Sequence, residues 1–291
     1  MMFTKKVPVW VTHHPLLLIA TGLLLVDLFI ALQFLDHRHA LTVAFLDVGQ
    51  GDAVFIQAPN GNQLLYDAGP PSGKVLRSLS RVMPFYDRSI DIAVLSHPDM
   101  DHIGGFIEVF DRFDISATLI SGASSENGVH DEMARLIKEE GSAHLVAQRG
   151  MQIELGDGVV VEVLYPDRDT THMETNDSSI VLRIYYGETS FLLSGDLPSS
   201  LEEHVVARDG LRLHANVLKL GHHGSRTSTS PLFLTAVHPD MAIISAGLDN
   251  RYGHPHKEVL DRLEEFHIPM LSTGVEGNIL FESDGLTVVR R

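Results

Sequence analysis

The chain has 291 residues, which is enough for one large domain or two small ones with a sizeable buried core. Its 22 basic and 38 acidic residues give a formal net charge of −16, which argues against a protein that grips nucleic acid through a broad basic surface. The sequence has no cysteine, so disulfides, cysteine zinc sites and thiol catalysis are excluded. Its 17 histidines become informative where they fall at the spacing of metal ligands.

The N-terminal part of the chain carries a long apolar run from Pro15 to Leu35, preceded by Lys5 and Lys6. At about 1.5 Å per helical residue, this run can cross a hydrocarbon core of about 30 Å. Asp27 near its middle costs on the order of 2.5–3.5 kcal/mol on insertion, which the surrounding Leu, Ile and Phe residues can offset. The run is longer than the apolar core of a signal peptide, and no Ala-x-Ala site follows it. We therefore expect an uncleaved transmembrane helix, with a cleavable signal peptide and a buried core helix as the alternatives.

The charges that flank this run predict its orientation. Lys5 and Lys6 favour a cytoplasmic N-terminus, although Arg38 after the run weakens the asymmetry. The sequence thus predicts a single-pass anchor over residues 1–39 in the cell membrane. A globular domain over residues 40–291 is then expected on the extracytoplasmic side.

From residue 41 onward, short β-rich runs alternate with helical ones, and a turn at Asn60-Gly61 marks a hairpin between the runs at 53–58 and 62–69. Strands are expected near 41–48, 53–58, 62–69, 90–96, 116–120, 143–147, 159–164, 178–186, 190–195, 216–220, 241–246, 277–282 and 286–290. Helices are expected near 73–83, 104–113, 129–140, 199–208 and 256–266. Since no Pro/Gly/Ser-rich linker divides the segment, we expect one domain in which two packed β-sheets are flanked by helices.

The strongest local signal is the stretch from Ser96 to Gly105, which follows an apolar strand and precedes a helix. It holds four potential metal ligands within six residues: His97, Asp99, Asp101 and His102. Imidazole nitrogens and carboxylate oxygens are both common ligands, and alternate residues of a loop can face two neighbouring cations. The alternative is a polar turn in which Asp99 or Asp101 caps the helix. That alternative does not require two histidines and two aspartates together.

This loop resembles the signature His-x-His-x-Asp-His of the metallo-β-lactamase superfamily, with Asp99 in place of the second histidine. The surrounding sequence resembles the C-terminal domain of bacterial competence proteins of the ComEC type. The likeness covers nearly all of residues 41–291 and is carried by seven ordered blocks. They are FLDVGQGDA (45–53), LLYDAG (64–69), the loop at 97–102, NDSSIVLRI (176–184), FLLSGDL (191–197), VLKLGHHGS (217–225) and SAG with YGHPH (245–256). The resemblance implies an αββα sandwich of two mixed sheets. The multi-span part of those proteins has no counterpart here, so we expect a single-anchor relative.

The later blocks supply further candidate residues. Asp196 follows the strand FLLS, and the resemblance implies that it bridges two metal ions; a turn aspartate is the alternative. Of the adjacent His222 and His223, whose side chains must diverge, one is expected to bind metal while the other meets substrate or packs. His254 is expected to face the site as a ligand or as a hydrogen-bond donor to a substrate oxyanion. Asp67 resembles a group that holds the ligand loops through hydrogen bonds.

One departure from the superfamily pattern concerns the histidine that many members carry before the strand at 178–184. Here the chain has Thr175-Asn176-Asp177, with His172 a few residues away. Asn176 or Asp177 could fill the position through an oxygen atom, or water could do so. The resulting site is rich in oxygen ligands, and carboxylates shift the preference toward manganese or magnesium. We expect two divalent ions, with manganese favoured and zinc second.

The candidate residues fall into four groups by expected role. The metal ligands are His97, Asp99, Asp101, His102, Asp196, His222 and His223. The catalytic candidates are Asp101, His223 and His254, and the candidates for substrate binding are Lys219, Ser225, Arg226 and His254. Asp67 and Asn176 are expected to support the ligands, whereas Asp52 is equally compatible with a supporting role or a plain turn.

Two neighbouring divalent ions can lower the pKa of a water molecule from about 15.7 toward 7 and neutralise a phosphodiester. The ions also supply positive potential where the acidic chain needs it. The resemblance therefore implies a membrane-anchored, metal-dependent phosphodiesterase, foremost a DNA nuclease that meets its substrate only at the active site. The alternatives are a hydrolase of phosphocholine esters, lactones or β-lactams, and a catalytically silent module that binds DNA or a partner. No sequence feature points to a protein partner.

Overall fold

The computed structural model describes residues 15–36, 40–126 and 128–291. The chain divides into two compact units, one ending at His39 and the other running from Ala40 to Arg291. The first unit contains helix α2 (Pro15–Asp36). Within the described residues, no helix combines the length and the apolarity that a membrane crossing requires. The predicted anchor stays a prediction, and the lysines that set its orientation, Lys5 and Lys6, lie outside the described residues.

The second unit is built on two mixed β-sheets. The eight-stranded sheet has the order β15-β14-β1-β2-β3-β4-β5-β6, and the seven-stranded sheet has the order β13-β12-β11-β10-β9-β8-β7. The strands of the first sheet are β1 (Leu41–Phe45), β2 (Val54–Gln57), β3 (Gln63–Tyr66), β4 (Ser89–Leu95), β5 (Asp114–Ile120), β6 (Ala143–Val146), β14 (Ile279–Ser283) and β15 (Val288–Arg290). Those of the second are β7 (Gln152–Gly156), β8 (Val159–Tyr165), β9 (Val181–Tyr186), β10 (Thr189–Leu193), β11 (Val217–Lys219), β12 (Met241–Ile244) and β13 (Met270–Ser272).

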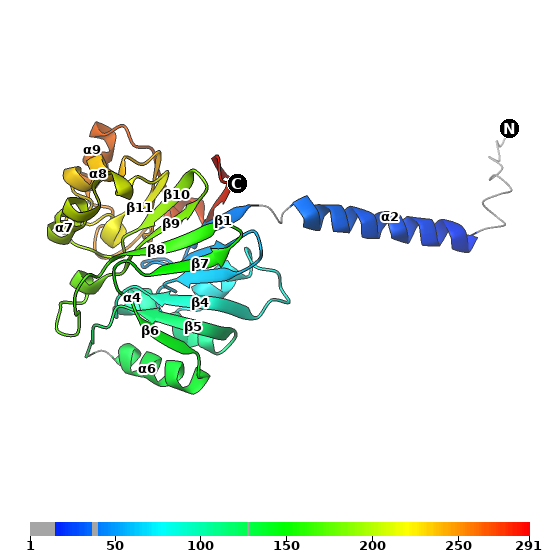
Figure 1. The fold of residues 1–291 in the computed structure, drawn as a ribbon, viewed down its shortest axis with the longest axis horizontal. Helices are drawn as coiled ribbons and strands as arrows, with labels where there is room; N and C mark the ends of the chain where they lie inside the picture. The colour runs from blue at the N-terminus through cyan, green and yellow to red at the C-terminus, as the bar shows by residue number, and fades with distance from the viewer. Residues whose placement is uncertain (1–14, 37–39, 127) are drawn as a thin grey trace. The chain divides into compact units, whose positions relative to one another are not determined.

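Helices cover the outer face of each sheet (Figure 1). The first sheet carries α3 (Lys74–Leu79), α4 (Met100–Ile103), α5 (Phe106–Phe110) and α6 (Gly128–Glu140). The second carries α7 (Ser199–Asp209), α8 (Pro231–Val237) and α9 (Lys257–Glu265). Shorter elements are η2 (Asn176–Ser178), η3 (Gly210–Leu213), η4 (Gly221–Gly224) and α10 (Thr273–Glu276). The predicted αββα sandwich is confirmed.

The central strands are apolar on both sides because both of their faces are buried. In β1, Val43 and Phe45 point into the core between the sheets, whereas Ala44 packs under the helices of the first sheet. In β10, Phe191 and Leu193 enter the same inner core, and Leu192 faces the helices of the second sheet. This two-sided burial explains why these strands are continuous apolar runs in the sequence.

The elements that the sequence analysis missed are short or lie at an edge. Strand β7 ends its sheet, and its residues are mostly half-exposed, so its apolar pattern is weak. Helix α8 has only seven residues, although its start follows ordinary chemistry, since the Ser230 side chain accepts from the Phe233 backbone N–H and Pro231 follows as the first residue. Strand β13 has three residues at the other edge of the same sheet.

The topology brings several loops to one edge of the sandwich. Strands β3 and β4 are parallel neighbours in the first sheet, and β10, β11 and β12 are parallel neighbours in the second. The segments that follow these strands contain Asp67, His97, Asp196, the 222–223 pair and His254. Residues far apart in the sequence therefore meet at the carboxyl ends of the strands of both sheets.

Candidate metal centre

The loop after β4 supplies the first group of polar side chains. His97 and His102 are fully buried, and their ring centroids lie 4.0 Å apart. Asp99 precedes α4 in extended conformation, and Asp101 lies within the helix; both carboxylates are partly exposed. The tight packing of this loop requires glycine at position 105. A Cβ on Gly105 would overlap the backbone carbonyl oxygen of Ala68, the residue after Asp67.

The second sheet supplies the facing group. Asp196 follows β10 through Gly195, which has a positive φ of 52°. In η4, His222 and His223 adopt consecutive left-handed conformations, with φ of 50° and 56°. This conformation is uncommon for residues other than glycine and turns the two adjacent side chains in different directions. The His223 ring is buried, whereas the His222 side chain is 27% exposed.

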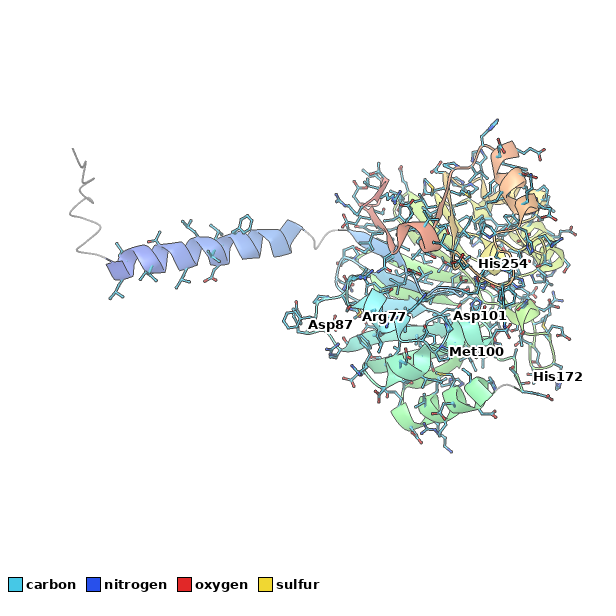
Figure 2. All side chains as sticks on the ribbon, turned by 180° about the vertical axis from the view of Figure 1, so that it is seen from behind. Arg77, Asp87, Met100, Asp101, His172 and His254 are labelled. Atoms are coloured by element: carbon cyan, nitrogen blue, oxygen red, sulfur yellow. The ribbon has the colours of Figure 1, made fainter. Side chains whose placement is uncertain are left out.

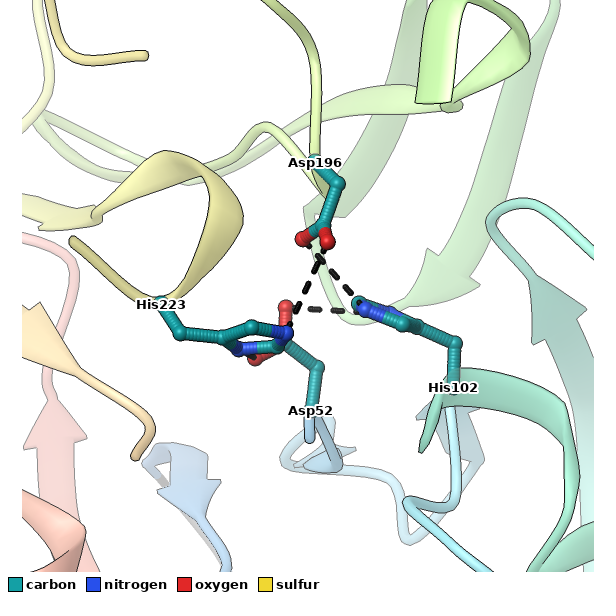
Figure 3. Close-up of side chains that lie close together, drawn as sticks. All are labelled: Asp52, His102, Asp196 and His223. Atoms are coloured by element: carbon teal, nitrogen blue, oxygen red, sulfur yellow. Dashed lines mark ion pairs between the residues drawn. The ribbon is translucent and has the colours of Figure 1, made fainter. Parts of the chain in front are cut away.

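The imidazoles converge on Asp196 (Figure 3). Its Oδ1 lies 3.3 Å from Nε2 of His102, and its Oδ2 lies 3.5 Å from Nε2 of His223. The same Oδ2 is 3.6 Å from Nε2 of His222 and 3.9 Å from Nε2 of His97. Asp196 is therefore the carboxylate around which the four imidazoles gather.

The two aspartates of the loop after β4 each lie close to one of these imidazoles. Oδ2 of Asp99 lies 3.7 Å from Nε2 of His97, and Oδ2 of Asp101 lies 3.5 Å from Nε2 of His223. His97 with Asp99 and His223 with Asp101 thus form two close pairs near Oδ2 of Asp196, and His102 lies at Oδ1.

Buried hydrogen-bond partners fix the outward-facing nitrogen of two of the imidazoles. Nδ1 of His102 lies 2.8 Å from Oδ2 of Asp67, and that carboxylate also accepts from the backbone N–H and the hydroxyl of Ser96. Nδ1 of His97 lies 2.9 Å from the Ser96 hydroxyl. With Nδ1 held in this way, Nε2 of each ring is presented to the centre, which is the usual arrangement behind metal-ligating histidines.

Asp52 faces the corresponding nitrogen of His223 in an ion pair. Its Oδ1 lies 3.2 Å from Nδ1 of His223, and its Oδ2 forms an ion pair with the Nζ of Lys219. Asp52, His102, Asp196 and His223 each offer a ligand atom within 4.8 Å of the others. Because Asp52 faces the Nδ1 atoms and is neutralised by Lys219, we assign it to holding His223.

Two predicted substrate-binding residues are corrected by their burial. The Lys219 side chain, at the end of β11, is fully buried and pairs with Asp52, so it does not face a substrate. Ser225 is also buried, and its hydroxyl lies 3.0 Å from that of Thr227. Arg226 remains exposed beside the site, with its guanidinium 3.3 Å from Glu258.

The donor set fits a metal. Nε2 of His97, His102 and His223 and Oδ1 of Asp196 are buried, and none has a hydrogen-bond partner among the described residues. A buried polar atom left without a partner costs about 1–3 kcal/mol. Four such atoms in one buried site, three of them on residues of a group whose ligand atoms lie within 4.8 Å of one another, indicate ligands of a cation, so the site can hold metal.

The charges of the metal-free site are strongly coupled. Burial disfavours the charged form of His102, but the Asp196 and Asp67 carboxylates outweigh it and raise the His102 pKa well above its usual range. Burial also disfavours the charged form of His223, but the Asp196 and Asp52 carboxylates outweigh it and raise the His223 pKa to about 9. Protons on these rings therefore occupy positions that a cation would take.

His97 behaves differently from the other two rings. Burial lowers its pKa to about 3, and the neighbouring His102 acts in the same direction. Asp196 is buried as well, yet His102 and His223 hold the pKa of its carboxyl well below the usual value. The centre thus contains an ionised carboxylate and one imidazole that stays neutral at physiological pH.

His254 lies at the mouth of the site, half-exposed, with its ring centroid 5.5 Å from that of His222. Asn250 holds it in place by accepting from its backbone N–H, and Nε2 of Gln50 lies 3.5 Å from its Nδ1. Figure 2 shows His254 and Asp101 among the side chains of this domain. Burial and the nearby His223 lower the His254 pKa to about 4, so its ring is neutral at pH 7.

The segment that lacks the usual third histidine lies against the same centre. The Ser179 hydroxyl accepts from the Asp196 backbone N–H and lies 3.5 Å from Nδ1 of His97. Oδ1 of Asn176 is buried and has no hydrogen-bond partner among the described residues. His172 is exposed at the outer edge of the domain, apart from Asp101 (Figure 2), and does not supply the missing imidazole.

Sequence reasoning did not single out Ser96, Ser179 or Gln50. Each lies inside a block that the resemblance had already marked, directly beside a candidate ligand or in the same turn. Their position beside a candidate ligand was therefore the feature of the sequence that could have identified them. Their residue types could not, because serine and glutamine are common in any loop.

The family model of the metallo-beta-lactamase superfamily matches residues 46–247, and the chain belongs to this superfamily. Competence protein ComA of Neisseria gonorrhoeae is 34% identical over 250 residues, which are 84% of this chain and 32% of that protein. ComE operon protein 3 of Bacillus subtilis is 32% identical over 255 residues, covering 82% of this chain and 32% of that protein. The chain thus spans about a third of the length of these relatives.

Solved structures show the same fold. Igni18, a metallo hydrolase from the archaeon Ignicoccus hospitalis, aligns with a TM-score of 0.53 at 14% identity. The alignment covers 84% of this chain and 99% of that one. The metallo-beta-lactamase fold protein YhfI of Bacillus subtilis aligns with a TM-score of 0.55 at 14% identity, covering 84% and 100%. The predicted superfamily membership is confirmed by the family model, and these structures share its fold.

Proposed function

We propose that the protein is a metal-dependent phosphodiesterase that cleaves DNA with two divalent ions, manganese preferred and zinc second. The observation that carries the proposal is the arrangement around Asp196. Beside this carboxylate, His97 lies close to Asp99 and His223 lies close to Asp101, and His102 approaches the second carboxylate oxygen. Three of these five side chains are imidazoles and two are carboxylates, so the oxygen share supports manganese.

When bound, two divalent ions lower the pKa of water and offset the charge of a phosphate group. The protein holds the ligands rigidly through Asp67 and Asp52, whose carboxylates fix the Nδ1 side of His102 and His223. His254 contributes a hydrogen-bond donor at the mouth. The amide of Gln50 lies 3.5 Å from Nδ1 of His254 and orients the ring, and a proton on Nε2 would meet a substrate oxygen.

The relatives support DNA as the substrate. Two of them are named competence protein and ComE operon protein, and Recombination protein 2 of Haemophilus influenzae is 31% identical over 237 residues. Competence and recombination are processes that act on DNA, which favours a phosphodiester over a phosphocholine ester, lactone or β-lactam. The formal charge of −16 makes the metal centre the place where DNA can be bound.

The test is hydrolysis by the purified full chain of single-stranded DNA, double-stranded DNA and bis(p-nitrophenyl) phosphate with Mn²⁺, Zn²⁺ or Mg²⁺. Manganese should stimulate cleavage, and Asp101→Ala should lower the rate by about a hundredfold or more. Asp111→Ala is the matched control, because Asp111 is exposed and remote from the ligands. Absence of hydrolysis with every divalent ion would contradict the proposal.

We also propose that residues 1–39 tether the catalytic domain to the cell membrane, with that domain on the extracytoplasmic side. The apolar run from Pro15 to Leu35 supports the tether. The full chain should stay in the membrane pellet after alkaline carbonate extraction, whereas residues 40–291 alone should be released. Recovery of the full chain in the carbonate supernatant would show that no tether exists.

A further inference from the structure

A cavity of about 390 Å³ lies beside the metal centre, between α6 and the outer face of the first sheet. Its lining includes His97 and Pro98 of the metal loop, and Gly141 and Ser142 in the turn after α6. Much of the remaining lining is aliphatic, formed by side chains of β4, β5 and α6 such as Leu95, Ile120, Met133 and Ile137. The pocket therefore shares a candidate metal ligand with the metal centre.

Polar groups are spaced along this pocket. His130 lines it from the first turn of α6, and Lys138 and His144 also line it, in the part of the chain that holds Gly141 and Ser142. The Ser142 hydroxyl is buried and has no hydrogen-bond partner among the described residues, which is costly unless a ligand satisfies it. Nδ1 of His144 is already engaged by the Thr118 hydroxyl at 3.1 Å, so the other ring nitrogen is directed elsewhere.

The chemistry of the lining selects among possible occupants. None of the described residues that line the pocket is Asp, Glu, Phe, Tyr or Trp. A quaternary ammonium group, as in phosphocholine, would find neither a counter-charge nor an aromatic face there. Lys138 offers only hydrogen-bond donors, and Ser142 offers one more. The pocket suits an organic group with an apolar body and hydrogen-bond acceptors at its far edge.

We infer that this pocket binds the nucleoside attached to the phosphate that the metal centre cleaves; the inference rests on the proposed function. The position supports it, because His97 forms part of both the pocket and the metal centre. The size supports it too, since pockets for small organic ligands occupy about 300–1,000 Å³. The base lies between the aliphatic walls, and its carbonyl or ring-nitrogen acceptors face Lys138 and Ser142.

The test is binding of thymidine 5′-monophosphate and of inorganic phosphate to the full chain loaded with Mn²⁺, measured by titration calorimetry. Ala134 is exposed and lines the pocket, so Ala134→Trp fills the space without disturbing the core. This variant should weaken nucleotide binding about tenfold and leave phosphate binding unchanged. Glu139→Trp is the matched control, because Glu139 lies on the same helix, is exposed and does not line the pocket.

Ser142→Ala and Lys138→Met test the polar end without adding volume, and each should weaken nucleotide binding several-fold. Circular dichroism checks that all the variants are folded. Equal affinity of Ala134→Trp and the unaltered chain for the nucleotide would overturn the inference. Nucleotide binding no tighter than that of phosphate would overturn it as well.

A hydrolysis assay separates this inference from the proposed function. Mn²⁺ binding reports on the metal centre alone, so Ala134→Trp should bind Mn²⁺ with the affinity of the unaltered chain while it hydrolyses DNA more slowly. A chain that binds the nucleotide in the pocket but hydrolyses no phosphodiester would contradict the proposed function alone. Loss of Mn²⁺ binding in Ala134→Trp would show that the substitution damages the metal centre, and the pocket would then not be a separate nucleoside site.

Discussion

At the scale of single residues, the site depends on charges placed behind the ligands. Lys219 precedes the Gly-His-His-Gly block and was expected to meet a phosphate, but β11 lies between β10 and β12, and the side chain is buried against Asp52. Sequence spacing cannot reveal this, because the lysine and the aspartate are 167 residues apart. The roles of His222 and His223 were likewise undecided in sequence, and the left-handed backbone of η4 separates them.

Removing the buried cation should therefore act on stability. Lys219→Met leaves the Asp52 carboxylate uncompensated and should lower the free energy of unfolding by about 3–5 kcal/mol, measured by urea denaturation. The double variant Asp52→Asn/Lys219→Met should recover part of that loss. Lys257→Met is the control, since Lys257 forms an exposed pair with Asp261 and should change stability by less than about 1 kcal/mol. A stable Lys219→Met variant with only a raised KM would instead place Lys219 at the substrate.

The protonation of His223 predicts how metal affinity depends on pH. Its pKa in the metal-free fold is about 9, so the ring is protonated at pH 7 and must lose that proton when a cation binds. Affinity should therefore rise as the pH rises from about 6.5 to 9, by about tenfold per pH unit for each proton displaced. Calorimetry of Mn²⁺ binding at pH 6.5, 7.5 and 8.5 measures this. Affinity that is constant over the range would contradict it, and His223→Gln should flatten the curve.

At the scale of secondary-structure elements, regularity decided what could be predicted. Long apolar strands such as β4 and amphipathic helices such as α9 follow a clear period, and both were predicted near their observed places. Strand β13 and helix α8 are too short to establish a period. The loops after the strands carry the site, and their paths depend on close backbone contacts that sequence patterns show only as glycines.

Gly105 provides a test at this scale. It has no positive φ, so its requirement is purely steric: a Cβ would overlap the Ala68 carbonyl and push α5 away from the Asp67 loop. Gly105→Ala should cost about 1–3 kcal/mol of stability and reduce metal affinity, because Asp67 holds His102. Gly128→Ala in α6 is the matched control, since nothing lies within 4 Å of its added Cβ. Thermal unfolding and Mn²⁺ titration of both variants measure these effects. Equal stability and equal Mn²⁺ affinity of Gly105→Ala and Gly128→Ala would contradict the steric requirement at Gly105.

At the scale of the whole domain, the resemblance predicted the sandwich and the convergence of distant blocks. It could not predict the distances between the two sheets' loops, since these depend on how the sheets pack. The first sheet contributes His97, Asp101 and His102, and the second contributes Asp196 and His223. A cation bound among them is therefore a cross-link between the two halves of the sandwich, in addition to its chemical role.

Metal removal should accordingly destabilise the whole domain. A cation present at about 100 times its dissociation constant adds about 2.7 kcal/mol, which for a domain of this size shifts the Tm by about 5–10 °C. Calorimetric scans of the Mn²⁺-loaded chain before and after EDTA treatment should show one cooperative transition that moves down by this amount. In Asp196→Ala the two scans should coincide, because the carboxylate around which the imidazoles gather is gone. An equal EDTA shift in that variant would mean that the stabilising cation binds somewhere other than between the two sheets.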